Sequence, residues 1–217
     1  MSNWFEQVRA KTDPILEAIK KHPFVLELLD GSLPREVFHF YVHQDAHYLA
    51  EYKKILALAG VRCARAEETH FFMASATEAI AVENALHQMF LKDVSINVAP
   101  SPTCELYTGF LTRIVCNHSI EEGLAALLPC YTIYQEIGEY ILGQQTGQNQ
   151  NPYQDWINTY GGEEFADSVK QAVAITNRYA QGAAEETLQK MEFAFERSSK
   201  MEWMFWDSAY NQEEWKI

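Results

Sequence analysis

Residues 38–52 read FHFYVHQDAHYLAEY, and the apolar residues in this stretch recur at intervals of three and four. Such spacing places them on one face of an α-helix. With about 100° between successive residues, Asp45 lies in the middle of this apolar face. A buried carboxylate is costly without a partner, so we expect another group to pair with Asp45. The stretch therefore predicts a core helix that carries an unusual inward acid.

Three histidines in the same stretch lie on a different face of the predicted helix. His39, His43 and His47 are spaced by four residues and lie about 160° from Asp45, in company with Lys54. Stacked histidines can bind a metal, but a stripe shared with lysine is more typical of a solvated or subunit-contact surface. We expect the three histidines to face outward and assign no metal site to them.

The spacing of three and four continues through most of the chain, whereas alternating runs typical of strands are scarce. The predicted fold class is therefore all-α. Gly31 closes one helix, Ser101 with Pro102 opens another, and Ser119 with Glu122 forms a capping box for the next. The predicted helices cover residues 3–20, 23–30, 34–59, 66–92, 102–117, 120–143, 152–159, 163–182 and 184–210.

The composition, 47% hydrophobic and 22% charged, is that of a globular protein with a substantial core. A polar turn at 143–152 and the pair Gly161–Gly162 separate helices, but no linker divides the chain, so we predict one domain over residues 1–217. The net charge of −13, without a basic cluster, argues against nucleic-acid or anionic-membrane partners. No leader-like start or membrane-length apolar run is present, so we expect a cytoplasmic protein.

A second inward acid is predicted in residues 188–210, LQKMEFAFERSSKMEWMFWDSAY. Apolar residues that include Met191 and Phe205 fall within about 60° of Glu202 on a helical projection. One inward carboxylate is readily explained by a hydrogen bond to a tyrosine or arginine. Two of them on helices distant in sequence, Asp45 and Glu202, favour a functional site.

A cysteine supplies the third candidate group. The four cysteines show no C-x-x-C pair, so neither a disulfide framework nor a structural zinc site is indicated. Cys130 shares a helical stripe with apolar residues, and the preceding Pro129 predicts a kink that opens space beside the thiol. A cysteine on such a stripe is most often an inert small hydrophobe, so the thiol alone does not establish a site.

Four motifs, in order and over nearly the whole chain, resemble the thiaminase II (TenA) family: HQDAHYL (43–49), LLPCYTIYQEIG (127–138), YQDWINTYGG (153–162) and SSKMEWMFWDSAY (198–210). The cysteine in the second motif resembles that of the aminopyrimidine aminohydrolase branch. The resemblance implies a haem-oxygenase-like helical bundle, a homotetramer, and neither cofactor nor metal. It also implies hydrolysis of 4-amino-5-aminomethyl-2-methylpyrimidine to the hydroxymethyl pyrimidine and ammonia, with slower cleavage of thiamin.

The resemblance also implies roles for individual residues. Cys130 matches the nucleophile, Glu202 the proton donor and Asp45 the carboxylate that binds the aminopyrimidine. If Glu202 protonates a ring nitrogen, a thiolate can add to the ring, the amine leaves, water adds and the thiol departs. We expect burial to raise the pKa of Glu202 while Asp45 stays ionised. The matching pocket tyrosines are Tyr48, Tyr107, Tyr134 and Tyr160, of which Tyr107 rests on spacing alone.

Three alternatives remain open. One is a metal-dependent oxidase in a helical bundle, which would need repeated inward Glu and E-x-x-H sets. Another is a haem oxygenase, for which His22 is a weak candidate as the proximal ligand. The third is a binding or regulatory protein that keeps the pocket without turnover, and the physiological substrate is also left open. The candidate metal ligands of the oxidase alternative are His39, His43, His47, the pair Glu67 and His70, and the pair Glu83 and His87.

Overall fold

The computed structural model describes residues 3–90, 98–145 and 151–217, with the backbone alone for 82–90. These residues form α-helices and no strand, which confirms the predicted fold class. The helices lie close to the predicted ranges. They are α1 (Trp4–Lys20), α2 (Pro23–Asp30), α3 (Arg35–Arg62), α4 (Ala66–Phe90), α5 (Pro102–Asn117), α6 (Ile120–Gln144), α7 (Gln154–Gly161), α8 (Glu163–Gln181) and α9 (Glu185–Tyr210).

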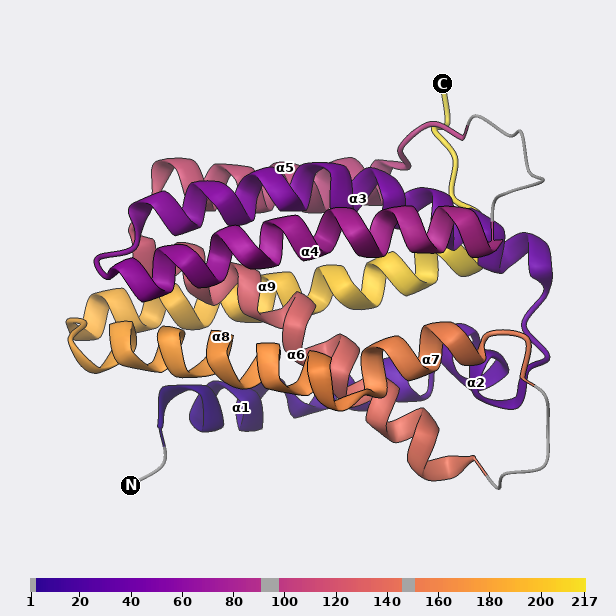
Figure 1. Ribbon diagram of the computed structural model, residues 1–217, viewed down its shortest axis with the longest axis horizontal. Coiled ribbons are helices and arrows are strands. Elements are labelled where there is room, and N and C mark those ends of the chain that lie inside the picture. The colour runs from indigo at the N-terminus through magenta and orange to yellow at the C-terminus, as the bar shows by residue number, and fades with distance from the viewer. Residues whose placement is uncertain (1–2, 91–97, 146–150) are drawn as a thin grey trace.

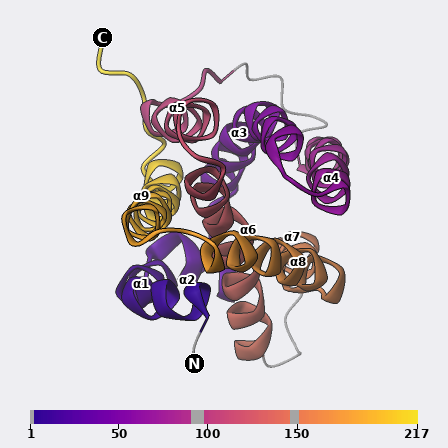
Figure 2. The same ribbon diagram turned by 90° about the vertical axis from the view of Figure 1, so that its left-hand side faces the viewer.

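Helix α6 runs obliquely through the middle of the bundle (Figures 1 and 2). It packs against α9, α7, α8 and α5, while α3 packs mainly on α4. In Figure 2, α3, α4 and α5 lie at the top of the bundle, α1 and α2 lie to the left of α6, and α7 and α8 lie to its right. Every element that surrounds α6 can therefore direct side chains toward the same interior, where Trp156, Trp206 and Tyr41 are the largest fully buried side chains.

Local signals fix several of the helix ends as predicted. Gly31 adopts φ 79°, the left-handed conformation that ends α2 at low steric cost. The Ser101 hydroxyl accepts a hydrogen bond from the Cys104 backbone N–H at the start of α5. Ser119 and Glu122 form the predicted capping box at the start of α6, each side chain accepting from the backbone N–H of the other residue.

Helix α3 continues three residues beyond its predicted end at residue 59. Gly60 lies inside the helix and does not end it. Its lack of a side chain instead allows α3 to pack closely against α4. A Cβ atom at this position would lie 3.1 Å from the Cβ of Phe72 on α4. The Thr69 hydroxyl also donates a 2.8 Å hydrogen bond to the Gly60 carbonyl. The predicted extension of α4 to residue 92 lies outside the described residues.

A second close approach joins α6 to α7. A Cβ atom at Gly138 would lie 2.5 Å from the Gly161 backbone nitrogen and 2.6 Å from the Tyr160 carbonyl carbon. No side chain fits between these two backbones, so glycine is required at the crossing. The contact holds the end of α7 directly against α6.

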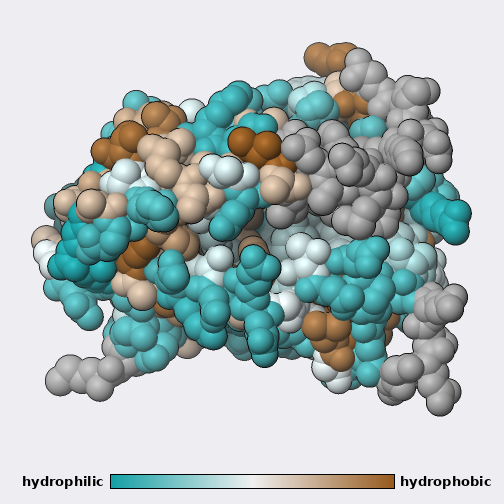
Figure 3. All heavy atoms as spheres, viewed as in Figure 1, coloured by the Kyte–Doolittle hydropathy of each residue, from teal (hydrophilic) through white to brown (hydrophobic). Residues whose placement is uncertain are grey.

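The surface of the bundle differs between its helices. On the face shown in Figure 3, hydrophilic side chains dominate over α8, whereas apolar side chains are more frequent over α3 and α4. In the part of the chain that the structure describes, no helix combines the length and apolar character required to cross a bilayer.

Candidate active site

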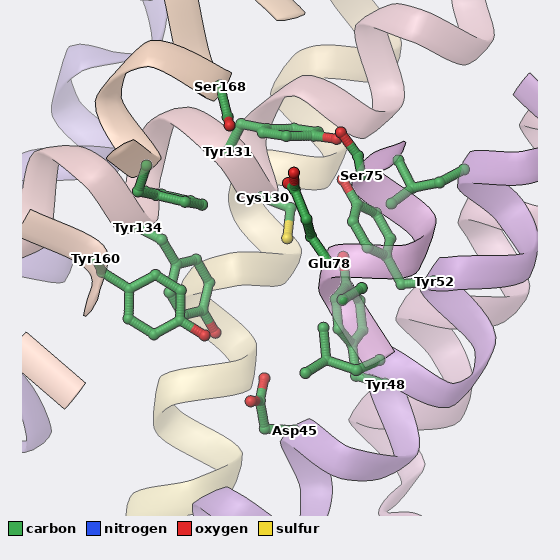
Figure 4. A pocket seen from close by; sticks show the side chains of 14 residues that line it. Asp45, Tyr48, Tyr52, Ser75, Glu78, Cys130, Tyr131, Tyr134, Tyr160 and Ser168 are labelled. Atoms are coloured by element: carbon green, nitrogen blue, oxygen red, sulfur yellow. The ribbon is translucent and has the colours of Figure 1, made fainter. Parts of the chain in front are cut away.

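A cavity of about 120 Å³ opens among α3, α4, α6, α7 and α8 (Figure 4). This volume is several times what one water molecule requires, so a small ring can enter. Apart from acidic, hydroxyl and thiol groups, the lining is aromatic or aliphatic. The lining side chains are Asp45, Tyr48, Leu49, Tyr52, Leu56, Ser75, Glu78, Ala79, Cys130, Tyr131, Tyr134, Tyr160, Phe165 and Ser168.

Both predicted inward acids are buried. Asp45 on α3 is 3% exposed and borders the cavity, into which its side chain points (Figure 4). Glu202 on α9 is 1% exposed and lies behind the cavity lining. The negative charge of Asp45 contributes to a raised pKa of Glu202, which shows that the two acids share one electrostatic environment.

Tyr107 holds the Glu202 carboxyl. Its hydroxyl lies 2.6 Å from Glu202 Oε1 and donates a hydrogen bond to it, and both side chains are fully buried. Burial raises the pKa of Glu202 to about 8, and the Tyr107 hydrogen bond opposes part of that rise. Glu202 is therefore mostly protonated at neutral pH. Tyr107 does not border the cavity, so its side chain contacts the acid rather than the open space.

Cys130 on α6 faces two tyrosines of α3. Its thiol is partly accessible through the cavity, and Figure 4 shows the sulfur pointing toward the side chains of Tyr48 and Tyr52. Burial, followed by the negative charge of Glu202, raises the Cys130 pKa well above its usual value, whereas the Tyr48 and Tyr52 hydroxyls lower it. The Tyr48 hydroxyl is buried and has no hydrogen-bond partner of normal geometry among the described residues. A bound ligand can therefore satisfy it.

The opposite wall of the cavity is a tyrosine pair. The rings of Tyr134 on α6 and Tyr160 on α7 are 4.8 Å apart, and both border the cavity. The contact of Gly138 with Gly161 brings these two helices together one turn further along α6. Behind the pair, the Tyr41 hydroxyl donates to the Tyr134 hydroxyl at 3.3 Å and accepts from Trp156 Nε1 at 3.3 Å.

The cavity opens to solvent between α4 and α8. Most lining side chains are buried, but Glu78 is exposed, and Phe165 and Ser168 are half-buried. Glu78 is close enough to Tyr131 for its charge to raise the pKa of that phenol. These residues form the mouth of the cavity.

The predicted outward face of α3 is only half-exposed. His39, His43 and His47 are each half-buried, and the segment before α5 contacts this helix at His47 and Gln44. His47 Nε2 donates to the Val98 carbonyl at 2.7 Å, and the Gln44 side chain donates to the Ala99 carbonyl at 3.0 Å. The three histidines therefore lie on the more exposed side of α3, opposite the buried Asp45, but none of them is fully exposed.

The candidate metal ligands whose side chains the structure describes do not converge. Glu67 and His70 are both exposed at the start of α4, while the side chains of Glu83 and His87 lie outside the described residues. No group of three or more His, Cys, Asp or Glu side chains in the described parts of the chain is arranged to hold a metal ion. His22 caps α2, where its Nδ1 accepts from the Phe24 N–H at 3.2 Å.

Several site residues were not predicted. Tyr52 lies on the face of the 38–52 helix that also carries Asp45, and this shared face was the available signal. Ser75 and Glu78 come from α4, where no sequence pattern separates them from other polar residues. Tyr131 directly follows the candidate cysteine, but its side chain contacts the far side of the cavity near Ser75.

Comparisons with known proteins identify the family to which the chain is similar. The TENA/THI-4/PQQC family matches residues 9–212. A Bacillus subtilis protein named aminopyrimidine aminohydrolase is 35% identical over 216 residues, which cover 97% of this chain and 91% of that protein. A protein of the same name from Halalkalibacterium halodurans is 30% identical over 211 residues and covers 94% of each chain.

Solved structures give the same fold. A TenA homologue from Pyrococcus furiosus superposes with a TM-score of 0.89 at 22% identity, covering 95% of this chain and 99% of that chain. A Shewanella denitrificans domain described as having a heme oxygenase-like fold has a TM-score of 0.76 at 16% identity, covering 96% and 92%. The haem-oxygenase-like fold is thus confirmed, and with a family match over almost its whole length the chain belongs to the TENA/THI-4/PQQC family.

Proposed function

We propose that this chain is an aminopyrimidine aminohydrolase of thiamin salvage. It would hydrolyse 4-amino-5-aminomethyl-2-methylpyrimidine to the hydroxymethyl pyrimidine and ammonia, and cleave thiamin as a second substrate. The observation that carries the proposal is the grouping of one thiol, one acid that stays protonated near neutral pH and one further carboxylate around a small aromatic cavity. The names of the Bacillus and Halalkalibacterium relatives support the same reaction.

Asp45 and the tyrosines would bind the pyrimidine. A carboxylate at Asp45 accepts hydrogen bonds from the exocyclic amine of the ring, and the flat ring fits between Tyr48 on one wall and Tyr134 with Tyr160 on the other. The Tyr48 hydroxyl, which has no hydrogen-bond partner of normal geometry among the described residues, can bond to a polar ligand that enters. Tyr107 would act one step away, by holding Glu202 in place.

Glu202 would be the proton donor. Its pKa of about 8 keeps the carboxyl protonated at neutral pH, and proton transfer to a ring nitrogen makes the pyrimidine electron-poor. Its charge raises the pKa of Cys130, and the charge of Asp45 raises the pKa of Glu202, so the three groups lie close enough to act together.

Cys130 would be the nucleophile and would start as a thiol. The raised pKa of Cys130 disfavours a free thiolate in the empty cavity, whereas a protonated ring supplies the positive charge that stabilises one. Sulfur adds to the ring as its proton passes to the Glu202 carboxylate left by the first proton transfer, and ammonia leaves from the methylene carbon. Water then adds to that carbon, and the ring expels the sulfur, which regains its proton. These steps require no metal or redox cofactor.

Assembly and location form the remaining part of the proposal. Exposed apolar side chains on α3 and α4 suit a subunit interface, in keeping with a homotetramer, which molar-mass measurement by light scattering would test. We place the enzyme in the cytoplasm. The exposed side chains concerned are Leu58, Val61, Met73 and Ile80.

The direct test is incubation of the purified protein with the aminomethyl pyrimidine. We expect stoichiometric ammonia and hydroxymethyl pyrimidine, detected by a coupled ammonia assay and mass spectrometry. Binding of the pyrimidine without ammonia release would instead support a protein that keeps the pocket without turnover. Oxygen consumption that disappears on chelation and returns with added metal would favour the oxidase-type alternative.

A further inference from the structure

Glu78 is the acid at the cavity mouth that the proposed reaction does not use. It comes from α4, borders the cavity and remains exposed to solvent. Figure 4 shows its side chain directed along the cavity from the α4 side, on the same side as Cys130 and away from the Asp45 end. Its charge reaches the Tyr131 hydroxyl on the far wall. A ligand anchored at Asp45 therefore extends toward Glu78.

The charged groups of the cavity all have one sign. Among the side chains that line it in the described parts of the chain, Asp45 and Glu78 are acids, and none is a lysine, arginine or histidine. Glu202 is a third acid and does not line the cavity, but its raised pKa keeps it mostly uncharged at neutral pH, so the cavity charge comes from Asp45 and Glu78. A cleft with charges of one sign and apolar walls concentrates ligands of the opposite charge and repels those of like charge.

We propose that the Glu78 carboxylate binds the positive charge on the substituent that leaves the pyrimidine, so that the enzyme selects pyrimidines whose methylene carbon carries a cationic group. This inference rests on the function proposed above. A primary alkylamine is protonated at neutral pH, and the quaternary ring nitrogen of thiamin is permanently cationic, so both leaving groups meet the requirement. A phosphorylated pyrimidine does not.

The chemistry predicts which kinetic constant changes. The ammonium charge is present in the bound substrate and disappears when neutral ammonia departs, so Glu78 stabilises the ground state at least as much as the transition state. Loss of its charge should therefore weaken substrate binding without slowing the chemical step. Because the carboxylate is solvated, we expect an effect of about three- to tenfold rather than orders of magnitude.

The experiment compares Glu78→Gln with a matched control on the same helix. Glu67→Gln also removes one exposed acid from α4, but Glu67 does not line the cavity and lies about three helical turns from Glu78. For wild type and both variants, kcat and KM are measured with the aminomethyl pyrimidine. The inhibition constant of the neutral hydroxymethyl pyrimidine is measured as well, since this product lacks the cation but keeps the same ring.

We expect Glu78→Gln to raise KM for the aminomethyl pyrimidine about three- to tenfold at nearly unchanged kcat, and to leave the inhibition constant of the hydroxymethyl compound unchanged. Glu67→Gln should match wild type in all three constants. Equal weakening of both ligands, or no difference between the two variants, overturns the role of Glu78 while the proposed function stands. Absence of ammonia from wild type overturns both.

Discussion

The Tyr107 hydroxyl donates a 2.6 Å hydrogen bond to Glu202 in a part of the core that solvent does not reach. The bond lowers the pKa of a carboxyl that burial raises to about 8. Tyr107→Phe should therefore raise the Glu202 pKa further and move the alkaline limb of the kcat/KM profile to higher pH. Tyr179→Phe, which removes a tyrosine hydrogen bond to Glu68 elsewhere, should leave the profile unchanged. An unmoved limb in the Tyr107 variant would show that another group sets it.

Glu202→Gln should remove the proton donor while keeping the shape of the side chain. We expect kcat to fall about 100- to 10,000-fold, the range typical of a lost general acid. In wild type, kcat/KM should decline above pH of about 8, as the carboxyl loses its proton. Steady-state ammonia release across pH measures both effects, and turnover by the variant close to wild type would exclude Glu202 as the donor.

The raised pKa of Cys130 predicts slow alkylation in the empty enzyme. At neutral pH, iodoacetamide should modify the exposed Cys116 well before Cys130, and the rate at Cys130 should climb as pH rises. Mass spectrometry of tryptic peptides follows both sites in one sample. Cys130→Ser should abolish ammonia release, whereas Cys116→Ser should retain it. Rapid modification of Cys130 at neutral pH would contradict a protonated thiol.

Burial of Glu202 also makes stability depend on pH. Its pKa rises from 4.5 in the unfolded chain to about 8 in the folded protein, so the folded state binds this proton more tightly. The free energy of unfolding that depends on this proton is fully present below pH of about 4.5. It is lost as pH rises through about 8, and the total loss is up to about 5 kcal/mol. Urea unfolding at several pH values measures it. Glu202→Gln should show a shallower decline than wild type over this window.

The contact of Gly138 with Gly161 predicts sensitivity to a single methyl group. Gly138→Ala would place a Cβ within 2.6 Å of backbone atoms of α7, so we expect a loss of about 1–3 kcal/mol. The midpoint of thermal unfolding should fall by several degrees. Gly109→Ala is the matched control, because nothing lies within 4 Å of its Cβ and the residue is exposed in α5. It should be neutral or slightly stabilising.

The all-α fold class and most helix ends could be predicted from the sequence, because helix periodicity and caps depend on residues close together in the chain. The sequence also identified Asp45 and Glu202, because a charged residue on an apolar face can be recognised from the pattern of a single helix. The role of Gly60 and the crossing at Gly138 were not visible, since both depend on which helices become neighbours. Glu78 was missed for the same reason, because an exposed acid on α4 gains meaning only when α8 faces it across the cavity.

Cys130, Tyr134 and Gly138 follow one another at intervals of four along α6, so the thiol, one aromatic wall and the backbone crossing all belong to one face of a single helix. Any rotation or shift of this part of α6 displaces the three together. Relatives that act on other heterocycles should therefore differ in side chains of the surrounding helices, while the position of α6 is conserved.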